Sequence, residues 1–155
     1  TIMRQKKFSK EKFKIYHPGG NIGNTLLLAK DIMLVGKKIP IINYKKKFKE
    51  ALREMNKKKL GTVVITKKQY IKGLLTDGDL RRGIKSFSNN QNLLEIMTQR
   101  PLVVNENMPA SKALGLMNEK KITSLLVVSD KDYKKNNKKL KGIIHIHSLL
   151  ENGIK

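Results

Sequence analysis

The sequence of 155 residues contains no cysteine, no tryptophan and few acidic residues. Without cysteine the chain can form neither disulfides nor thiolate metal sites. It also lacks an apolar run approaching the roughly 20 residues that cross a bilayer, and its basic, polar N-terminus lacks the apolar segment of a secretory signal. We therefore expect a cytoplasmic protein. Because hydrophobic residues still make up 39% of the chain, we expect a packed core.

The scarcity of acidic residues leaves a formal net charge of +22, carried almost entirely by lysine. A charge of this size makes nucleic acid a candidate partner. Proteins that read or clamp nucleic acids rely on arginine forks and stacking aromatics, whereas aromatics are only 5% of this chain and its lysines are spread throughout. Codon usage rich in A and T, which inflates Lys, Asn and Ile together, accounts better for this composition. A basic surface would still attract anionic metabolites.

The chain carries one structural pattern twice. An acidic residue, Ile and Met open each copy, at residues 31–33 and 95–97. Each copy then predicts a helix, because its apolar residues recur at i, i+3, i+4 and i+7. These positions are Phe48, Ala51, Leu52 and Met55 in the first copy and Ala110, Ala113, Leu114 and Met117 in the second.

Apolar stretches predict one strand before this helix and two after it. The strands cover residues 39–42, 61–65 and 70–76 in the first copy and 102–104, 124–128 and 140–146 in the second. Polar residues between the last two strands predict turns at 66–69 and 129–139, and the lysine-rich stretch 134–139 predicts a solvated hairpin tip. A short helix closes each copy, so the order β-α-β-β-α is predicted twice.

A single unit of about 60 residues is marginally stable on its own. Two units can bury their sheets against each other, which gives one core and leaves a cleft between the halves. We therefore predict an α/β (α+β) fold with pseudo-twofold symmetry, in which Met33 and Met97 occupy equivalent places. The alternative is an ordinary α/β domain with accidental self-similarity.

The two units, with Ile-Met at the entry and Gly-apolar-apolar before Thr-x-x-Asp, resemble tandem cystathionine-β-synthase-type (CBS) repeats, which form a Bateman module. The resemblance spans residues 31–153 and implies a regulatory module that senses a small ligand. We place the first repeat at residues 29–90 and the second at 91–155. Because CBS pairs commonly dimerise, the resemblance also implies a homodimer.

Residues 73–79 of the first repeat have the pattern of an anion site. A strand ends at Thr76 and a helix begins, so free N–H groups and the positive end of the helix dipole point at one spot. Thr76 and Asp79 also form a capping box, which needs no ligand. In CBS pairs, however, this Thr and this Asp bind the nucleotide, with the carboxylate on the ribose. The candidate ligand-binding residues here are Thr76, Asp77, Asp79, Arg81 and Arg82.

The second repeat departs from this pattern, because His145 replaces the Thr and Ser148 replaces the Asp. An adenosine phosphate bound in the usual way is therefore in doubt in this half. His145 and His147 alternate at the end of a predicted strand, so they should face the same side. No third ligand is evident nearby, so we expect no metal. His145, His147 and Ser148 either contact an acidic ligand or are simply polar residues at a sheet edge.

Residues 17–20 read His-Pro-Gly-Gly, which alone indicates only a turn or linker. Taken with residues 76–82 and 142–147, this run resembles the D-arabinose 5-phosphate isomerases of the KpsF/KdsD/GutQ type, in which a sugar-isomerase (SIS) domain precedes the CBS pair. Residues 1–28 are then the end of a SIS domain and a linker. The resemblance implies that His17 is catalytic within an intact SIS domain. Because the chain begins at Thr1, we expect a piece of a longer polypeptide, without isomerase activity or cofactor of its own.

The resemblance implies the regulatory CBS pair of an enzyme that interconverts ribulose 5-phosphate and arabinose 5-phosphate, at the entry to 3-deoxy-manno-octulosonate (Kdo) for lipopolysaccharide. Its cleft is predicted to bind an anionic nucleotide or a nucleotide sugar such as CMP-Kdo. The predicted partners are the SIS domain of the same polypeptide and a second copy of the chain. Three alternatives are an adenine-nucleotide sensor, a lysine-rich nucleic-acid-binding protein and a ligand-free dimerisation module.

Overall fold

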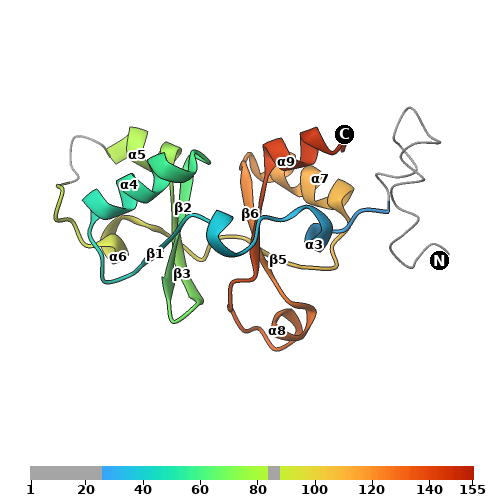
Figure 1. The fold of residues 1–155 in the computed structure, drawn as a ribbon, viewed down its shortest axis with the longest axis horizontal. Coiled ribbons are helices and arrows are strands. Elements are labelled where there is room, and N and C mark those ends of the chain that lie inside the picture. Colours follow the sequence, from blue (N-terminus) through green and yellow to red (C-terminus); the bar gives the residue numbers. More distant parts are fainter. Residues whose placement is uncertain (1–25, 84–87) are drawn as a thin grey trace.

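Two small sheets stand side by side at the centre of the molecule, and helices flank each of them (Figure 1). The computed structural model describes residues 26–83 and 88–155. The first repeat contains α3 (Ala29–Ile32), the 3-10 turn η1 (Gly36–Lys38), β1 (Ile41–Asn43), α4 (Phe48–Lys58), β2 (Thr62–Lys67), β3 (Tyr70–Thr76) and α5 (Asp77–Gly83). The second contains α6 (Leu93–Ile96), β4 (Thr98–Gln99), β5 (Val103–Asn105), α7 (Ala110–Lys120), β6 (Ser124–Val128), α8 (Asp130–Lys134), β7 (Gly142–His145) and α9 (Ile146–Glu151).

The strand pairing is the same in both repeats. In each, a short strand runs parallel to the central strand, which pairs antiparallel with the strand that follows it: β1-β2-β3 in the first and β5-β6-β7 in the second. The parallel pair needs a crossover, and α4 or α7 provides it. The predicted mixed α/β fold with two β-α-β-β-α units is therefore confirmed.

The central strands are buried because both of their faces are covered. Every residue of β6 is buried, as are the first five of β2. On one face lie the apolar sides of the crossover helices, including Met55 of α4 and Met117 of α7, which are 3% and 0% exposed. On the other face the two sheets meet through a shared cluster of Ile39, Val64, Leu126 and Ile143. Burial on both sides explains why these strands are almost uniformly apolar.

Each repeat sends its entry segment to the other half of the molecule. Helix α3, from the first repeat, packs into the core cluster of the second repeat through Ala29 and Ile32. Helix α6, from the second repeat, packs into the core cluster of the first through Leu93. Strand β4 likewise pairs with β3, which makes the first sheet four-stranded, and Leu34 forms the matching bridge to Ile143. Neither core is complete without a segment of the other repeat.

Two glycines mark the points where these exchanged segments cross. A Cβ on Gly73 would lie 2.8 Å from the carbonyl oxygen of Thr98 and would also overlap Met97. A Cβ on Gly142 would lie 2.9 Å from the carbonyl oxygen of Leu34 and would overlap Met33. Met33 and Met97 therefore occupy equivalent places, as the predicted pseudo-twofold symmetry requires.

The loop of the second repeat differs from the prediction. The sequence predicts only a polar turn for residues 129–139. This prediction is wrong for residues 130–134, which form the helix α8. The hydroxyl of Ser129 accepts a hydrogen bond from the Asp132 N–H at 3.1 Å and caps this helix. In the first repeat the corresponding turn is tight, with positive φ at Lys68 and Gln69, as two-residue hairpin turns require. No helix among residues 26–83 and 88–155 has the length and apolar character to cross a membrane.

The crossing glycines give a test of the exchanged packing. We expect Gly73→Ala to lower the free energy of unfolding by about 2 kcal/mol, because the backbone carbonyl that a methyl group meets cannot move away cheaply. Gly115→Ala is the control, since nothing lies within 4 Å of a Cβ at that position in α7. It should raise stability by up to about 1 kcal/mol, the helix preference of Ala over Gly. Urea denaturation measures both, and equal effects would contradict the exchange.

Candidate functional site

A cleft of about 870 Å³ opens between the two repeats. Its cationic lining residues are Lys59, Arg81, Arg82, Arg100, Lys120 and Lys121, and its carboxylates are Asp77 and Asp79. Its main apolar lining residues are Leu60, Leu74, Pro101, Leu102, Ile122 and Ile146. Apolar walls with a few charged groups are typical of small-molecule sites, and the volume falls within their usual range. The excess of cations favours an anionic occupant.

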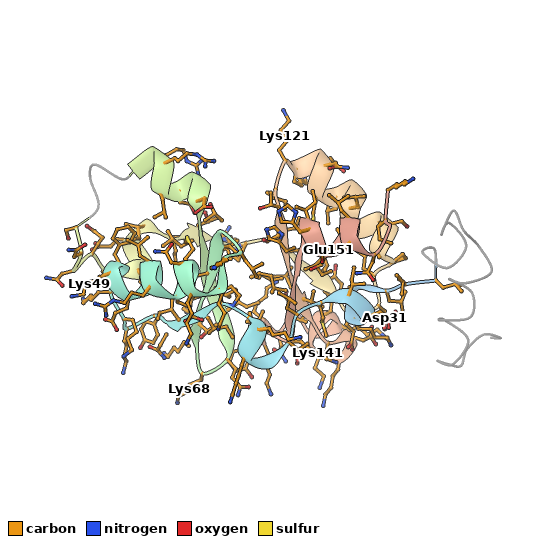
Figure 2. The ribbon with its side chains drawn as sticks, turned by 45° about the horizontal axis from the view of Figure 1, so that its top comes forward. Asp31, Lys49, Lys68, Lys121, Lys141 and Glu151 are labelled. Carbon is orange, nitrogen blue, oxygen red and sulfur yellow. The ribbon has the colours of Figure 1, made fainter. Side chains whose placement is uncertain are left out.

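The pseudo-twofold symmetry places matching residues on the two sides of the cleft. Lys59 and Lys121 end the two crossover helices in the left-handed conformation, with φ of 59° and 57°. A left-handed residue ends a helix and turns the chain away from it. The next residues, Leu60 and Ile122, then lead into the central strands along the cleft wall. Lys121 is labelled at the second-repeat side in Figure 2, where its side chain extends away from the ribbon.

Thr76 and Asp79 form the capping box that their spacing predicts. The Asp79 carboxylate accepts hydrogen bonds from the Thr76 N–H at 3.0 Å and from the Thr76 hydroxyl at 3.1 Å. The Asp79 N–H in turn donates to the Thr76 hydroxyl at 3.2 Å. The same carboxylate accepts from Thr98 at 3.1 Å and forms an ion pair with Arg82 at 2.6 Å. Its oxygens are therefore engaged within the chain, and a ribose would have to replace one of these contacts.

His145 closes β7 and caps α9 with its imidazole. It is 6% exposed, and its Nδ1 accepts a hydrogen bond from the His147 N–H at 3.2 Å. The expectation that the two histidines alternate along a strand is wrong, because the strand ends at His145. The first turn of α9 nevertheless brings the rings together, with centroids 4.8 Å apart.

Burial holds the pKa of His145 below its ordinary value, and the neighbouring His147 lowers this pKa further. A hydrogen bond with the Leu60 backbone, across the cleft in the first repeat, acts in the opposite direction. The neutral imidazole can accept at Nδ1 only while that nitrogen carries no proton. A neutral His145 is therefore part of the helix cap.

Seven of the predicted ligand-binding residues line the cleft: Thr76, Asp77, Asp79, Arg81, Arg82, His145 and His147. Ser148 is not among the lining residues, and its carbonyl accepts a hydrogen bond from Asn152 at 2.7 Å. His17 and most of the stretch 1–28 lie outside the described residues. Within the described part of the chain, no three His, Asp or Glu side chains gather as a metal site would need.

Sequence reasoning missed several cleft residues. Lys59, Arg100, Lys121 and Ser124 line the cleft, although none of them is among the ligand-binding residues that the sequence predicts. The available signal was the repeat itself, because Lys59 and Lys121 each follow the last residue of a matched helix. That both helix ends face one cleft cannot be predicted from the sequence, because it depends on how the two repeats pack together.

Two β-α-β-β-α units with exchanged entry segments, enclosing one cationic cleft, define a tandem-repeat α/β module. The CBS domain family matches this chain at residues 29–86 and again at 93–154. The chain therefore belongs to the CBS domain family, as a pair of CBS domains. This confirms the resemblance that the sequence predicted.

Several longer proteins are similar to this chain over almost its whole length. An uncharacterised protein of Rickettsia prowazekii is 40% identical over 99% of the chain and 46% of that protein. The arabinose 5-phosphate isomerase KdsD of Yersinia pestis is 38% identical, and that of Escherichia coli 36%, each over 99% of the chain and 46% of the enzyme. The chain thus spans about half the length of the curated relatives that it matches.

Solved structures support the fold. The CBS domain of a bacterial CNNM/CorC family Mg²⁺ transporter, in complex with ATP, has a TM-score of 0.70 at 16% identity and covers 94% of this chain and 99% of that chain. A CBS domain protein of Pyrobaculum aerophilum complexed with AMP has a TM-score of 0.66 at 16% identity and covers 79% of this chain and 89% of that chain. At these identities the likeness shows the fold alone.

The capping box of the first repeat can be tested separately from ligand binding. We expect Thr76→Ala to lower the free energy of unfolding by about 1 kcal/mol, because the Asp79 N–H loses its acceptor. Thr76→Ser keeps the hydroxyl and should cost much less. Urea denaturation without ligand measures both variants, and an equal loss in the two would show that the hydroxyl does not stabilise the helix.

The cap on α9 predicts a pH dependence of stability. The pKa of His145 is lower in the folded state than its ordinary value of 6.5, so between these two values the unfolded chain binds more protons. Stability should therefore fall as the pH drops from about 7.5 to about 5.5. His145→Thr, which copies the first repeat, keeps a side-chain acceptor that does not titrate and should flatten this slope. The melting temperature of each protein is measured across this pH range. An equally steep change of melting temperature with pH in both proteins would contradict the assignment.

Proposed function

We propose that this chain is the regulatory CBS pair of an arabinose 5-phosphate isomerase and that its cleft senses an anionic nucleotide or nucleotide sugar. The parent enzyme would interconvert ribulose 5-phosphate and arabinose 5-phosphate for Kdo and lipopolysaccharide synthesis in the cytoplasm. The proposed ligand is CMP-Kdo, an end product whose binding would report the supply of Kdo. The chain itself would then have no isomerase activity.

The observation that carries this proposal is the cationic cleft between the repeats. Six lysine or arginine side chains and two carboxylates line it, and one of those carboxylates is paired with Arg82. An anion placed among them gains favourable interactions with several cations at once. The apolar lining offers surface for a base or a sugar ring, as small-molecule sites commonly do.

The relatives supply the context of the proposal. Enzymes named arabinose 5-phosphate isomerase are similar to this chain over 99% of its length, and the chain accounts for 46% of theirs. The remaining half would hold the SIS domain, in which His17 would contribute to the proton transfer between neighbouring carbons that an aldose–ketose isomerisation needs. A homodimer of CBS pairs would bring two such domains together.

Regulation would follow from differential binding. A ligand in the cleft contacts both repeats at once, so it favours whichever relative position of the repeats suits it best. If that position is coupled to the conformation of the SIS domain, the ligand changes activity by the ratio of its affinities for the two states.

An adenine nucleotide is the second candidate ligand. Two observations favour it: the Thr76–Asp79 motif of the first repeat, and the ATP or AMP bound in the similar solved structures. Against it stands the second repeat, where His145 and Ser148 replace the matching Thr and Asp.

A ligand panel separates these candidates. We expect CMP-Kdo to raise the melting temperature more than CMP, AMP or ATP, since ligand at 100 times its dissociation constant adds about 2.7 kcal/mol to stability. Arg100→Gln, which removes one cleft charge, should weaken the shift. Lys49→Ala is the matched control, because Lys49 lies at the end of α4 away from the cleft (Figure 2).

Each contrary outcome of the panel is specific. A larger shift with AMP or ATP would identify an adenine-nucleotide sensor, and no shift with any ligand would favour a dimerisation module. Binding of unrelated nucleic acids that weakens steeply with added salt would indicate a lysine-dependent nucleic-acid surface.

A further inference from the structure

The two sides of the cleft carry different charges, although their backbones match. We propose that the anionic group of the ligand, a phosphate or a carboxylate, binds on the second-repeat side beside Ser124 and Lys121. The first-repeat side, with Asp77 and Asp79, then receives the neutral, hydroxyl-bearing part. This assignment rests on the proposed function, that the cleft binds an anionic small molecule. It differs from the motif-based expectation, which centres the phosphate on Thr76.

The first-repeat side is poorly prepared for an anion. Both carboxylates of the cleft, Asp77 and Asp79, lie on this side. The Thr76 hydroxyl is committed to Asp79 at 3.1 Å, and the Arg82 guanidinium is paired with the same carboxylate at 2.6 Å. An anion here would meet two carboxylates, and of the three cations on this side, Lys59, Arg81 and Arg82, the last is already paired.

The second-repeat side has cations and no carboxylate. The end of α7, the loop after it and the start of β6 contribute residues 120–124 to the lining, and β7 and α9 add His145, Ile146 and His147. Lys121 is exposed, and His147 is an exposed imidazole on the same side. An anion on this side therefore meets attraction without a competing carboxylate from the second repeat.

The side chain of Ser124 lacks a hydrogen-bond partner, which is an observation independent of the charges in the cleft. Its side-chain oxygen is the one buried side-chain nitrogen or oxygen without a hydrogen bond within residues 26–83 and 88–155. Ser124 lies directly across the strand pair from His145 and lines the cleft. Buried hydroxyls are normally hydrogen-bonded. Because this unpaired hydroxyl lies in the wall of the cleft, we infer that a ligand supplies its hydrogen-bond partner.

The first repeat shows what a structural hydroxyl looks like at the same position. Thr62 occupies the place of Ser124, since it pairs with Thr76 as Ser124 pairs with His145. The Thr62 hydroxyl donates to the Leu75 carbonyl at 3.2 Å. Thr62 is not among the residues that line the cleft. One copy of the repeat thus uses this hydroxyl to hold the fold, and the other leaves it for a ligand.

The experiment uses the symmetry to supply matched variants of the full chain. Isothermal titration calorimetry at fixed ionic strength measures CMP-Kdo, AMP and inorganic pyrophosphate against the wild type, so that a sugar carboxylate and a phosphate are both tested. The probe that binds is then measured with Ser124→Ala and Lys121→Met. Thr62→Val and Lys59→Met are their counterparts in the first repeat. Melting temperatures without ligand are recorded for all four variants.

We expect Ser124→Ala to weaken binding about tenfold, the value of one hydrogen bond to a charged group, and to raise the melting temperature of the free protein. Thr62→Val should lower that temperature and leave affinity within about twofold. Lys121→Met should weaken binding about threefold more than Lys59→Met.

Two results would overturn the assignment while leaving the proposed function intact. One is an unchanged affinity in Ser124→Ala, and the other is a larger loss in Lys59→Met than in Lys121→Met. Failure of the wild type to bind any of the three probes would overturn the proposed function itself, and this assignment with it.

Discussion

The close backbone contacts at Gly73 and Gly142 hold the two halves of the molecule together. At each contact the entry segment of one repeat lies against the last strand of the other, with no room for a side chain between them. The entry helices α3 and α6 follow these segments into the opposite cores. Each half therefore gains its core only by associating with its twin, which is how a unit too small to be stable alone becomes part of a stable pair. The cleft lies between two halves that these crossings join.

The two repeats have matching backbones but different side chains where they face the cleft. Both repeats start the closing helix at the same place, but the first caps it with a Thr76–Asp79 box and the second with a neutral His145. The first cap brings a carboxylate to the cleft and the second does not. A ligand therefore meets two different walls. If its own charge is unevenly distributed, the two walls favour a single orientation of the ligand. A nucleotide or nucleotide sugar has such a distribution.

The cleft also connects ligand binding to the fold. His145 contacts the Leu60 backbone across the cleft, and Asp79 contacts Thr98 from the second repeat. These polar contacts join the repeats at the same place where a ligand would join them. A ligand that replaces either contact changes how tightly the two halves are held, which is the kind of differential interaction that a regulatory module needs.

The order of elements and the buried helix faces could be predicted from the sequence, because helical periodicity and apolar strands are local properties. The capping box at Thr76 was local too, and α8 could have been found from Ser129 and Asp132. Only the tertiary structure decided which sheet each entry segment joins, since the sequence order of two like repeats is the same whether they pack separately or exchange. It alone brought Lys59 and Lys121 to one cleft and left Ser124 without a partner, because both depend on how the two halves meet.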